Sequence, residues 1–181
     1  MRKEIEVKAK VADLDTITQK ILELGCTLSE SLIQNDTIFV DDNYGPFDKF
    51  QPDKNLLRIR ESSGKFLFTI KQPKGNQLDC IERETEILNP QEMREALLLM
   101  GYHEAVQVHK VRIKTNYNNW EICLDKVEGL GSFIEVEKIC EYTDAEKVQN
   151  ELFAFLQTLG IALEDRIYEG YDTLVYLSKK N

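Results

Sequence analysis

The sequence predicts an α+β fold in which an antiparallel β-sheet carries amphipathic helices on one side. Seven short segments alternate apolar and polar residues with a period of two, which is typical of half-buried strands, and residues 37–40 are a further short predicted strand. Three other segments repeat apolar residues with the period of a helix and end near a glycine. With 181 residues, of which 42% are hydrophobic, the chain can bury a core as a single domain, residues 1–181.

The predicted strands follow one another along most of the chain. Side chains of successive strand residues point to opposite faces, so seven of these strands, all except residues 37–40, have one largely apolar face and one face that carries charge. The segments are residues 4–10, 37–40, 56–61, 66–71, 80–87, 106–115, 120–125 and 133–139.

The three predicted helices begin at recognisable capping residues. The first begins after Asp13 and the second after Asn89, which is followed by a proline at the first helical position. The third begins at Thr143 and Glu146, which have the spacing of a capping box. The tail, residues 165–177, shows a mixed pattern. The apolar sides of the helices need a surface to pack on, and the apolar strand faces supply one.

Charge and composition exclude several classes of partner. The chain has 23 Lys plus Arg and 32 Asp plus Glu, a formal net charge of −9, which argues against a nucleic-acid or anionic-membrane binder. Its apolar runs are too short to cross a bilayer, and its start lacks an apolar signal core. The four cysteines show no CxxC spacing, which favours reduced thiols in a cytoplasmic protein.

The charged strand faces lie opposite the helices, where they meet water in an open sheet or line the interior of a closed barrel of about eight strands. Their cations are Lys8, Arg58, Arg60, Lys71, Lys110 and Arg112. Their carboxylates are Glu4, Glu6, Glu84, Glu86, Asp125, Glu135 and Glu137. Grouped Arg and Lys suit phosphate oxygens, and carboxylates select hard cations. Together the two sets suit a polyphosphate that carries Mg²⁺ or Mn²⁺.

Several of these segments, taken in order, resemble the signatures of the CYTH superfamily, the triphosphate tunnel metalloenzymes. This group includes class IV adenylate cyclases and thiamine triphosphatases. Residues 4–8 (EIEVK) resemble its ExExK motif, and residues 124–137 (LDKVEGLGSFIEVE) resemble its LDxVxGLGxFxExE stretch. The other resembling segments are residues 57–60 (LRIR), 69–71 (TIK), 83–86 (RETE) and 110–112 (KVR). The ordered set covers nearly the whole chain.

The resemblance implies an antiparallel, eight-stranded, closed and tunnel-like β-barrel with a charged interior and helices packed outside. It implies that the six cations named above bind the oxygens of a small triphosphate, with Mg²⁺ or Mn²⁺ as cofactor. The catalytic set that it implies is Lys8, Glu6, Lys71 and Arg112. The implied metal ligands are Glu4, Glu6, Asp125, Glu135 and Glu137. Further candidates are Glu84, Glu86 and Tyr171.

The leading functional expectation is metal-dependent hydrolysis of an inorganic or organic triphosphate, such as tripolyphosphate, thiamine triphosphate or a nucleoside triphosphate. One alternative is a class IV (CyaB-type) adenylate cyclase, which makes cyclic AMP and pyrophosphate from ATP. The cyclases of this family carry a His-Phe pair before ExExK, and three other residues stand there in this sequence. The other alternative is a non-catalytic polyphosphate-binding module. The loop 41–55 has the length of a lid, or it is a plain connection.

Overall fold

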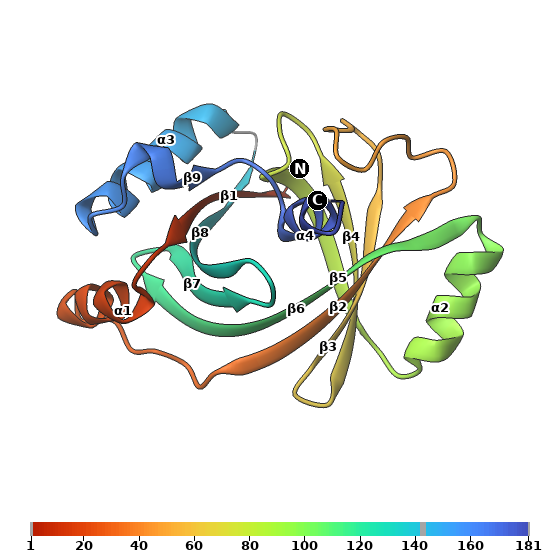
Figure 1. Cartoon of the computed structure of the whole chain (residues 1–181), viewed down its shortest axis with the longest axis horizontal. Coiled ribbons are helices and arrows are strands. Elements are labelled where there is room, and N and C mark those ends of the chain that lie inside the picture. The colour runs from red at the N-terminus through yellow and green to blue at the C-terminus, as the bar shows by residue number, and fades with distance from the viewer. Residues whose placement is uncertain (1, 142–143, 181) are drawn as a thin grey trace.

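Eight strands close into an antiparallel barrel in the computed structural model, which describes residues 2–141 and 144–180 (Figure 1). The neighbour order is β5-β4-β3-β2-β6-β7-β8-β1, and pairing between β1 and β5 completes the ring. The strands are β1 (Arg2–Val11), β2 (Leu32–Asp41), β3 (Leu56–Ser62), β4 (Lys65–Pro73), β5 (Asp79–Ile87), β6 (Tyr102–Tyr117), β7 (Trp120–Val127) and β8 (Gly131–Glu141). The predicted tunnel-like α+β fold is therefore confirmed.

The barrel closes through a short seam. β1 pairs with β5 at Glu4–Cys80 and at Ile5–Asp79. Farther along β1, residues 8 and 9 pair instead with a ninth strand, β9 (Arg166–Ile167). The C-terminal segment thus completes the wall where β1 and β5 diverge.

The three predicted helices are present, and each begins at a side-chain cap. They are α1 (Leu14–Glu23), α2 (Pro90–Leu99) and α3 (Ala145–Thr158). Asp13 and Asn89 accept hydrogen bonds from backbone N–H groups of α1 and α2, as predicted. α3 is capped by Asp144, one residue after the predicted cap; Thr143 itself lies outside the described residues.

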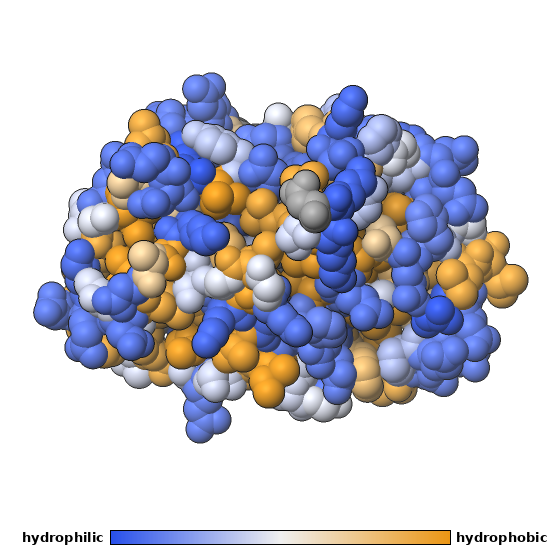
Figure 2. All heavy atoms as spheres, in the orientation of Figure 1, coloured by the Kyte–Doolittle hydropathy of each residue, from blue (hydrophilic) through white to orange (hydrophobic). Residues whose placement is uncertain are grey.

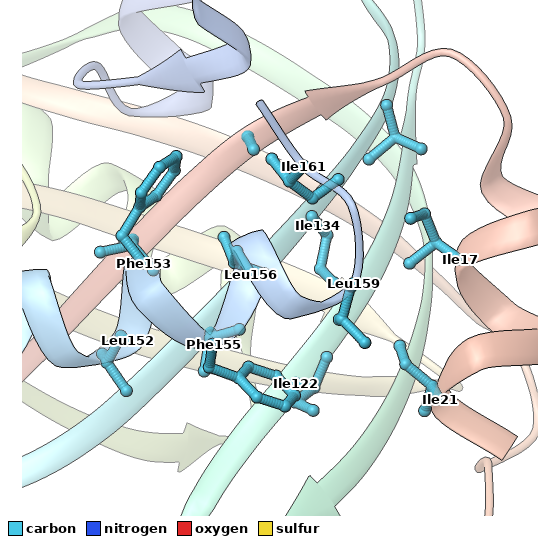
Figure 3. Packing of buried hydrophobic residues seen from close by; sticks show 14 of the residues in the cluster. Ile17, Ile21, Ile122, Ile134, Leu152, Phe153, Phe155, Leu156, Leu159 and Ile161 are labelled. Atoms are coloured by element: carbon cyan, nitrogen blue, oxygen red, sulfur yellow. The ribbon is translucent and has the colours of Figure 1, made fainter. Parts of the chain in front are cut away.

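Helices α1 and α3 cover the outer face of β1, β7 and β8. Ile5, Val7 and Ala9 point outward from β1 and are fully buried beneath them. Figure 3 shows Ile17 and Ile21 of α1 on one side of this cluster and Leu152 and Phe153 of α3 on the other. Because the apolar strand faces point outward to the helices, the charged faces point into the barrel.

Helix α2 covers another part of the outer wall. Its buried Leu97 packs with Phe39 of β2 and with Leu57 and Ile59 of β3. Figure 1 shows α2 on the opposite side of the barrel from α1 and α3. On the face shown in Figure 2, hydrophilic residues predominate and apolar residues occur in small groups between them. None of the helices in the described residues has the length and apolar character needed to span a membrane.

The tail forms a fourth helix, α4 (Tyr171–Ser178), which closes one end of the barrel interior. Tyr171 and Val175 are buried there, and Tyr44 and Phe47 from the loop between β2 and β3 join them. The ring of Phe47 lies 5.1 Å from that of Tyr176. The inward-facing strand residues of this apolar end are Ile38, Val40, Val106, Val108, Val127 and Phe133. The interior is therefore charged over part of its length and apolar at the end that α4 closes.

Candidate functional site

The barrel interior encloses a cavity of about 220 Å³, and most of the predicted site residues line it. All six predicted cations do so: Lys8, Arg58, Arg60, Lys71, Lys110 and Arg112. The other predicted residues that line it are Glu4, Glu6, Glu84, Glu135, Glu137 and Tyr171. Strand alternation places all of them except Tyr171 there, since they occupy inward positions of β1, β3, β4, β5, β6 and β8. Tyr171 reaches the cavity from α4.

Asp125 does not line the cavity but lies directly behind Arg112. It is fully buried and accepts a hydrogen bond from Nε of Arg112 at 2.7 Å. The Tyr171 hydroxyl donates to its Oδ2 at 2.8 Å. The nitrogen of Lys110 lies 3.9 Å from the same oxygen. The carboxylate of Asp125 thus orients Arg112 and Tyr171 from behind.

The two remaining acidic candidates on β5 lie in different surroundings. Glu84 accepts hydrogen bonds from Thr69 at 2.8 Å and from Arg58 at 3.1 Å, so it orients an arginine of the cavity. Glu86 does not line the cavity and pairs with the exposed Lys65 at 3.1 Å. It lies two residues farther from the site along the same face of β5.

Each arginine on β3 is held by a carboxylate outside the set predicted from the sequence. Asp36 accepts two hydrogen bonds from Arg60, both at 2.6 Å. Burial would raise the pKa of Asp36, but Arg60 and Arg58 hold it far below its usual range. Glu82 lies 3.3 Å from Arg58 and 2.6 Å from the nitrogen of Lys71. Both arginines are therefore pre-oriented toward the cavity.

Lys8 lies at the centre of a second charge network. Its side chain is 1% exposed, and its ammonium nitrogen lies 3.0 Å from Glu135 and 3.3 Å from Glu6. Burial opposes its charge, but Glu135 and Glu6 raise the pKa of Lys8 to about 12. Glu135 also forms an ion pair with Arg112, which joins β1, β6 and β8 across the interior.

Lys110 is the least compensated cation that the described residues place in the cavity. It is 6% exposed, and the carboxylate nearest to it in the structure is that of Asp125, at 3.9 Å. The ring of Tyr171 lies 4.8 Å from its nitrogen. Burial and the neighbouring charge of Arg112 lower the pKa of Lys110 to about 8. An anion in the cavity would satisfy this ammonium group.

Three glutamates form the group best suited to a metal ion. Glu4, Glu6 and Glu137 each offer a carboxylate oxygen, and these oxygens lie within 4.8 Å of one another. Burial raises the pKa of Glu137 to about 8 and that of Glu4 to about 7, and repulsion between the carboxylates adds to both shifts. An all-oxygen, negatively charged donor set suits Mg²⁺ or Mn²⁺.

A second possible group includes a thiol. Glu121, Cys123 and Glu137 also bring their ligand atoms within 4.8 Å of one another. Burial raises the pKa of the Cys123 thiol well above its usual value, so the sulfur stays protonated at neutral pH. The three carboxylates of Glu4, Glu6 and Glu137 are therefore the better ligands for a hard cation.

The crowded carboxylates predict an unusual pH dependence of stability. Because Glu4 and Glu137 have raised pKa values, the metal-free folded protein holds protons between about pH 4.5 and 8 that the unfolded chain has released. The free energy of unfolding should therefore fall as pH rises through this window. Glu137→Gln should flatten the decline and make the metal-free protein more stable than wild type at pH 8. Denaturant titrations of both proteins from pH 5 to 8 measure this effect. The same dependence of unfolding free energy on pH in wild type and Glu137→Gln would contradict the prediction.

Comparisons with known proteins agree with this architecture. The family model of the CYTH domain matches residues 2–171. A protein of Methanocaldococcus jannaschii named "Putative adenylate cyclase" is 29% identical over 171 residues, which span 93% of this chain and 95% of that protein. The PH1012 protein of Pyrococcus horikoshii is 27% identical, with a TM-score of 0.80 over 95% of this chain and 99% of that one.

A more distant structure shows the same fold. A protein from Hippeastrum is 21% identical and has a TM-score of 0.64, covering 99% of this chain and 96% of that one. The resemblance found in the sequence is confirmed by the family match, which extends over nearly the whole chain. Together with the closed barrel and its charged cavity, that match shows that the chain belongs to the CYTH domain family.

Proposed function

We propose that this protein is a divalent-metal-dependent enzyme that hydrolyses a triphosphate inside its barrel. One observation carries the proposal: seven buried or half-buried cations, the six predicted ones and Lys114, converge with three crowded carboxylates on a single cavity. A triphosphate with its metal would neutralise both groups at once. A structural role alone would not require Lys110 to be buried with so little compensation.

The cations serve as a pre-oriented frame for the phosphate oxygens. Phosphoryl transfer depends mainly on positioning and on the stabilisation of charge on those oxygens. Asp36 and Asp125 each engage one edge of an arginine, Arg60 or Arg112. A guanidinium group has five N–H donors, so each arginine keeps donors for phosphate. The frame needs little rearrangement when the transition state forms.

Lys8, Lys71 and Lys110 supply point charges where the arginines supply planar forks. Glu4, Glu6 and Glu137 would hold the metal, while Asp125 and Glu135 position the basic groups. When bound, the metal would neutralise phosphate oxygens and lower the pKa of a water molecule. The chemistry needs no Ser, Cys or His nucleophile from the chain.

A product assay tests the proposal and its alternatives. The protein is incubated with Mg²⁺ or Mn²⁺ and with tripolyphosphate, thiamine triphosphate or ATP, and the products are separated. We expect orthophosphate as a product. Cyclic AMP with pyrophosphate would support the cyclase alternative, and tight binding without turnover would support a non-catalytic module.

The cyclase alternative has specific support and must be tested directly. The Methanocaldococcus relative is named for this activity. The Hippeastrum protein is described as a putative adenylyl cyclase with a dominant triphosphatase activity. Since both reactions use a bound triphosphate, the analysis of products from ATP separates them.

Lys110 predicts how tripolyphosphate affinity depends on pH. Because its pKa is lowered to about 8, Lys110 must take up a proton to bind an anion above that pH. The ratio of wild-type to Lys110→Arg affinity should therefore fall up to about tenfold per pH unit above 8. Titration of the ligand and of the carboxylates affects both proteins equally, so it does not change this ratio. Calorimetry without metal from pH 7 to 9.5 measures it, and a constant ratio would refute the role of Lys110.

A further inference from the structure

We infer that Gln149 of α3 is a positioning residue for the proposed metal site, because it holds the backbone of Glu6 at a gap in the barrel wall. The inference rests on the proposed function and adds to it a residue on the outside of the barrel. Gln149 is 6% exposed and does not line the cavity, so it acts through the strand that carries the metal ligand.

The gap lies along one edge of β1, between the two strands that pair with that edge. β5 pairs with it at residues 4 and 5, and β9 pairs with it at residues 8 and 9. Glu6 lies between these pairings, and its backbone N–H donates to the carbonyl of Leu78 at 2.9 Å. The N–H and carbonyl of one strand residue point to the same side, so the carbonyl of Glu6 faces the gap as well.

The side-chain amide of Gln149 fills this gap. Its nitrogen donates to the carbonyl of Glu6 at 3.1 Å and to that of Leu78 at 3.4 Å. The neighbouring buried residues of α3, Val148 and Leu152, belong to the apolar cluster between α3 and the barrel. A polar side chain in this layer is explained by the backbone carbonyl that it satisfies, because a buried carbonyl without a partner costs free energy.

The turn between β4 and β5 fixes the amide of Gln149 from the other side. Nδ2 of Asn76 donates to Oε1 of Gln149 at 3.0 Å, and Oδ1 of Asn76 accepts from Nε2 of Gln149 at 3.1 Å. The same Oδ1 accepts from the backbone N–H of Leu78 at 2.9 Å. The backbone N–H of Lys74 closes the turn by donating to the carbonyl of Asp79 at 2.8 Å. The backbone of β1 is thereby tied to both α3 and this turn.

The inward side chains of β1 depend on this tie. The carboxylate of Glu6 is one of the three whose oxygens lie within 4.8 Å of one another, and it lies 3.3 Å from the nitrogen of Lys8. Metal–ligand distances are held within about 0.2 Å, so a small shift of this backbone moves the Glu6 oxygen away from the position that a metal requires. Gln149 thus sets the geometry of the metal site without touching the metal.

The test replaces the amide with an apolar side chain of similar length and volume, in Gln149→Met. We expect Mn²⁺ affinity, measured by calorimetry on the whole protein, to fall about tenfold. Turnover of tripolyphosphate should fall at limiting Mn²⁺ and recover most of its rate at saturating Mn²⁺, because all three carboxylates are still present. The affinity for tripolyphosphate without metal should change less than the affinity for Mn²⁺, since Asp36 and Asp125 still orient their arginines.

Val148→Ala is the control for a loss of stability alone. Val148 is 4% exposed in the same layer, so its truncation destabilises the protein but leaves the carbonyl of Glu6 paired. Its Mn²⁺ affinity should match that of wild type. Gln149→Asn is a milder second variant, whose amide is one methylene too short to reach both Glu6 and Asn76; its Mn²⁺ affinity should also fall, and it decides the matter if Gln149→Met does not fold.

The outcomes separate this inference from the proposed function. Wild-type Mn²⁺ affinity in the Gln149 variants, or an equal loss in Val148→Ala, would overturn the positioning role and leave the proposed function intact. A wild type that binds Mn²⁺ but turns over no triphosphate would overturn the proposed function alone. A wild type that binds no Mn²⁺ would overturn both.

Discussion

Glu6→Gln should lower the metal-dependent kcat/KM by roughly 10²–10³-fold while leaving the fold intact. Glu6 offers one of the three carboxylate oxygens that lie within 4.8 Å of one another. The substitution removes a charge from this donor set but keeps a side chain of the same shape. Lys8 retains Glu135 at 3.0 Å after the change, so the buried ammonium group stays paired.

Mn²⁺ binding by calorimetry and turnover with tripolyphosphate measure the effect. We expect Mn²⁺ affinity to fall together with activity and the melting temperature without metal to remain at or above that of wild type. Glu86→Gln is the matched control, since Glu86 pairs with Lys65 outside the cavity and its change should leave both quantities unaltered. Wild-type Mn²⁺ affinity in Glu6→Gln would remove Glu6 from the proposed metal site.

The barrel was predictable because strand alternation carries information about both faces. Outward residues such as Ile5 and Val7 must meet the helices, so inward residues such as Glu6 and Lys8 must share an enclosed space. The sequence pattern alone left an open sheet possible. Closure depends on the pairing of β1 with β5, two strands that lie far apart in the chain. No local sequence pattern encodes that contact. The family resemblance supplied it.

Two cavity carboxylates, Asp36 and Glu82, were not predicted from the sequence, and each was missed for an identifiable reason. Asp36 was missed because the second strand was predicted to begin at residue 37, whereas it begins at Leu32. Asp36 therefore lay just outside the predicted strand, although it shares a face with Gln34 and Ile38. Glu82 lies on the same face of β5 as Glu84 but was not among the carboxylates selected from the sequence. Its ion pairs with Arg58 and Lys71 cross two strands and depend on register, which sequence alone does not provide.

The apolar end of the interior was hidden for a different reason. Val106 and Val108 share one face of β6 with Lys110, and the apolar positions change face between Val108 and Val111. This change of face does not by itself show what covers the apolar section. The difference arises because α4 enters that end of the barrel and supplies Tyr171 and Val175. A tail with a mixed pattern gave no sign of this contact, although Tyr171 itself was a candidate.

Lys8→Met should also lower kcat/KM by roughly 10²–10³-fold, but it should destabilise the protein as well. Methionine fills the space of a side chain that is 1% exposed, yet it leaves Glu135 and Glu6 without their ammonium partner. Removing one member of a buried ion pair typically costs about 3–5 kcal/mol, and the remaining contact between Glu135 and Arg112 should reduce that cost. Assays must therefore run well below the melting temperature of the variant.

A double variant separates the loss of charge from the loss of stability. In Lys8→Met/Glu135→Gln the unpaired carboxylate is removed, so the melting temperature should recover toward wild type while activity stays low. Lys10→Met is the matched control, because Lys10 lies two residues farther along β1, is exposed and does not line the cavity. If activity returned with stability in the double variant, Lys8 would act on the fold and not on the triphosphate. Continued inactivity in a stable protein would place its ammonium group among those that hold the phosphates.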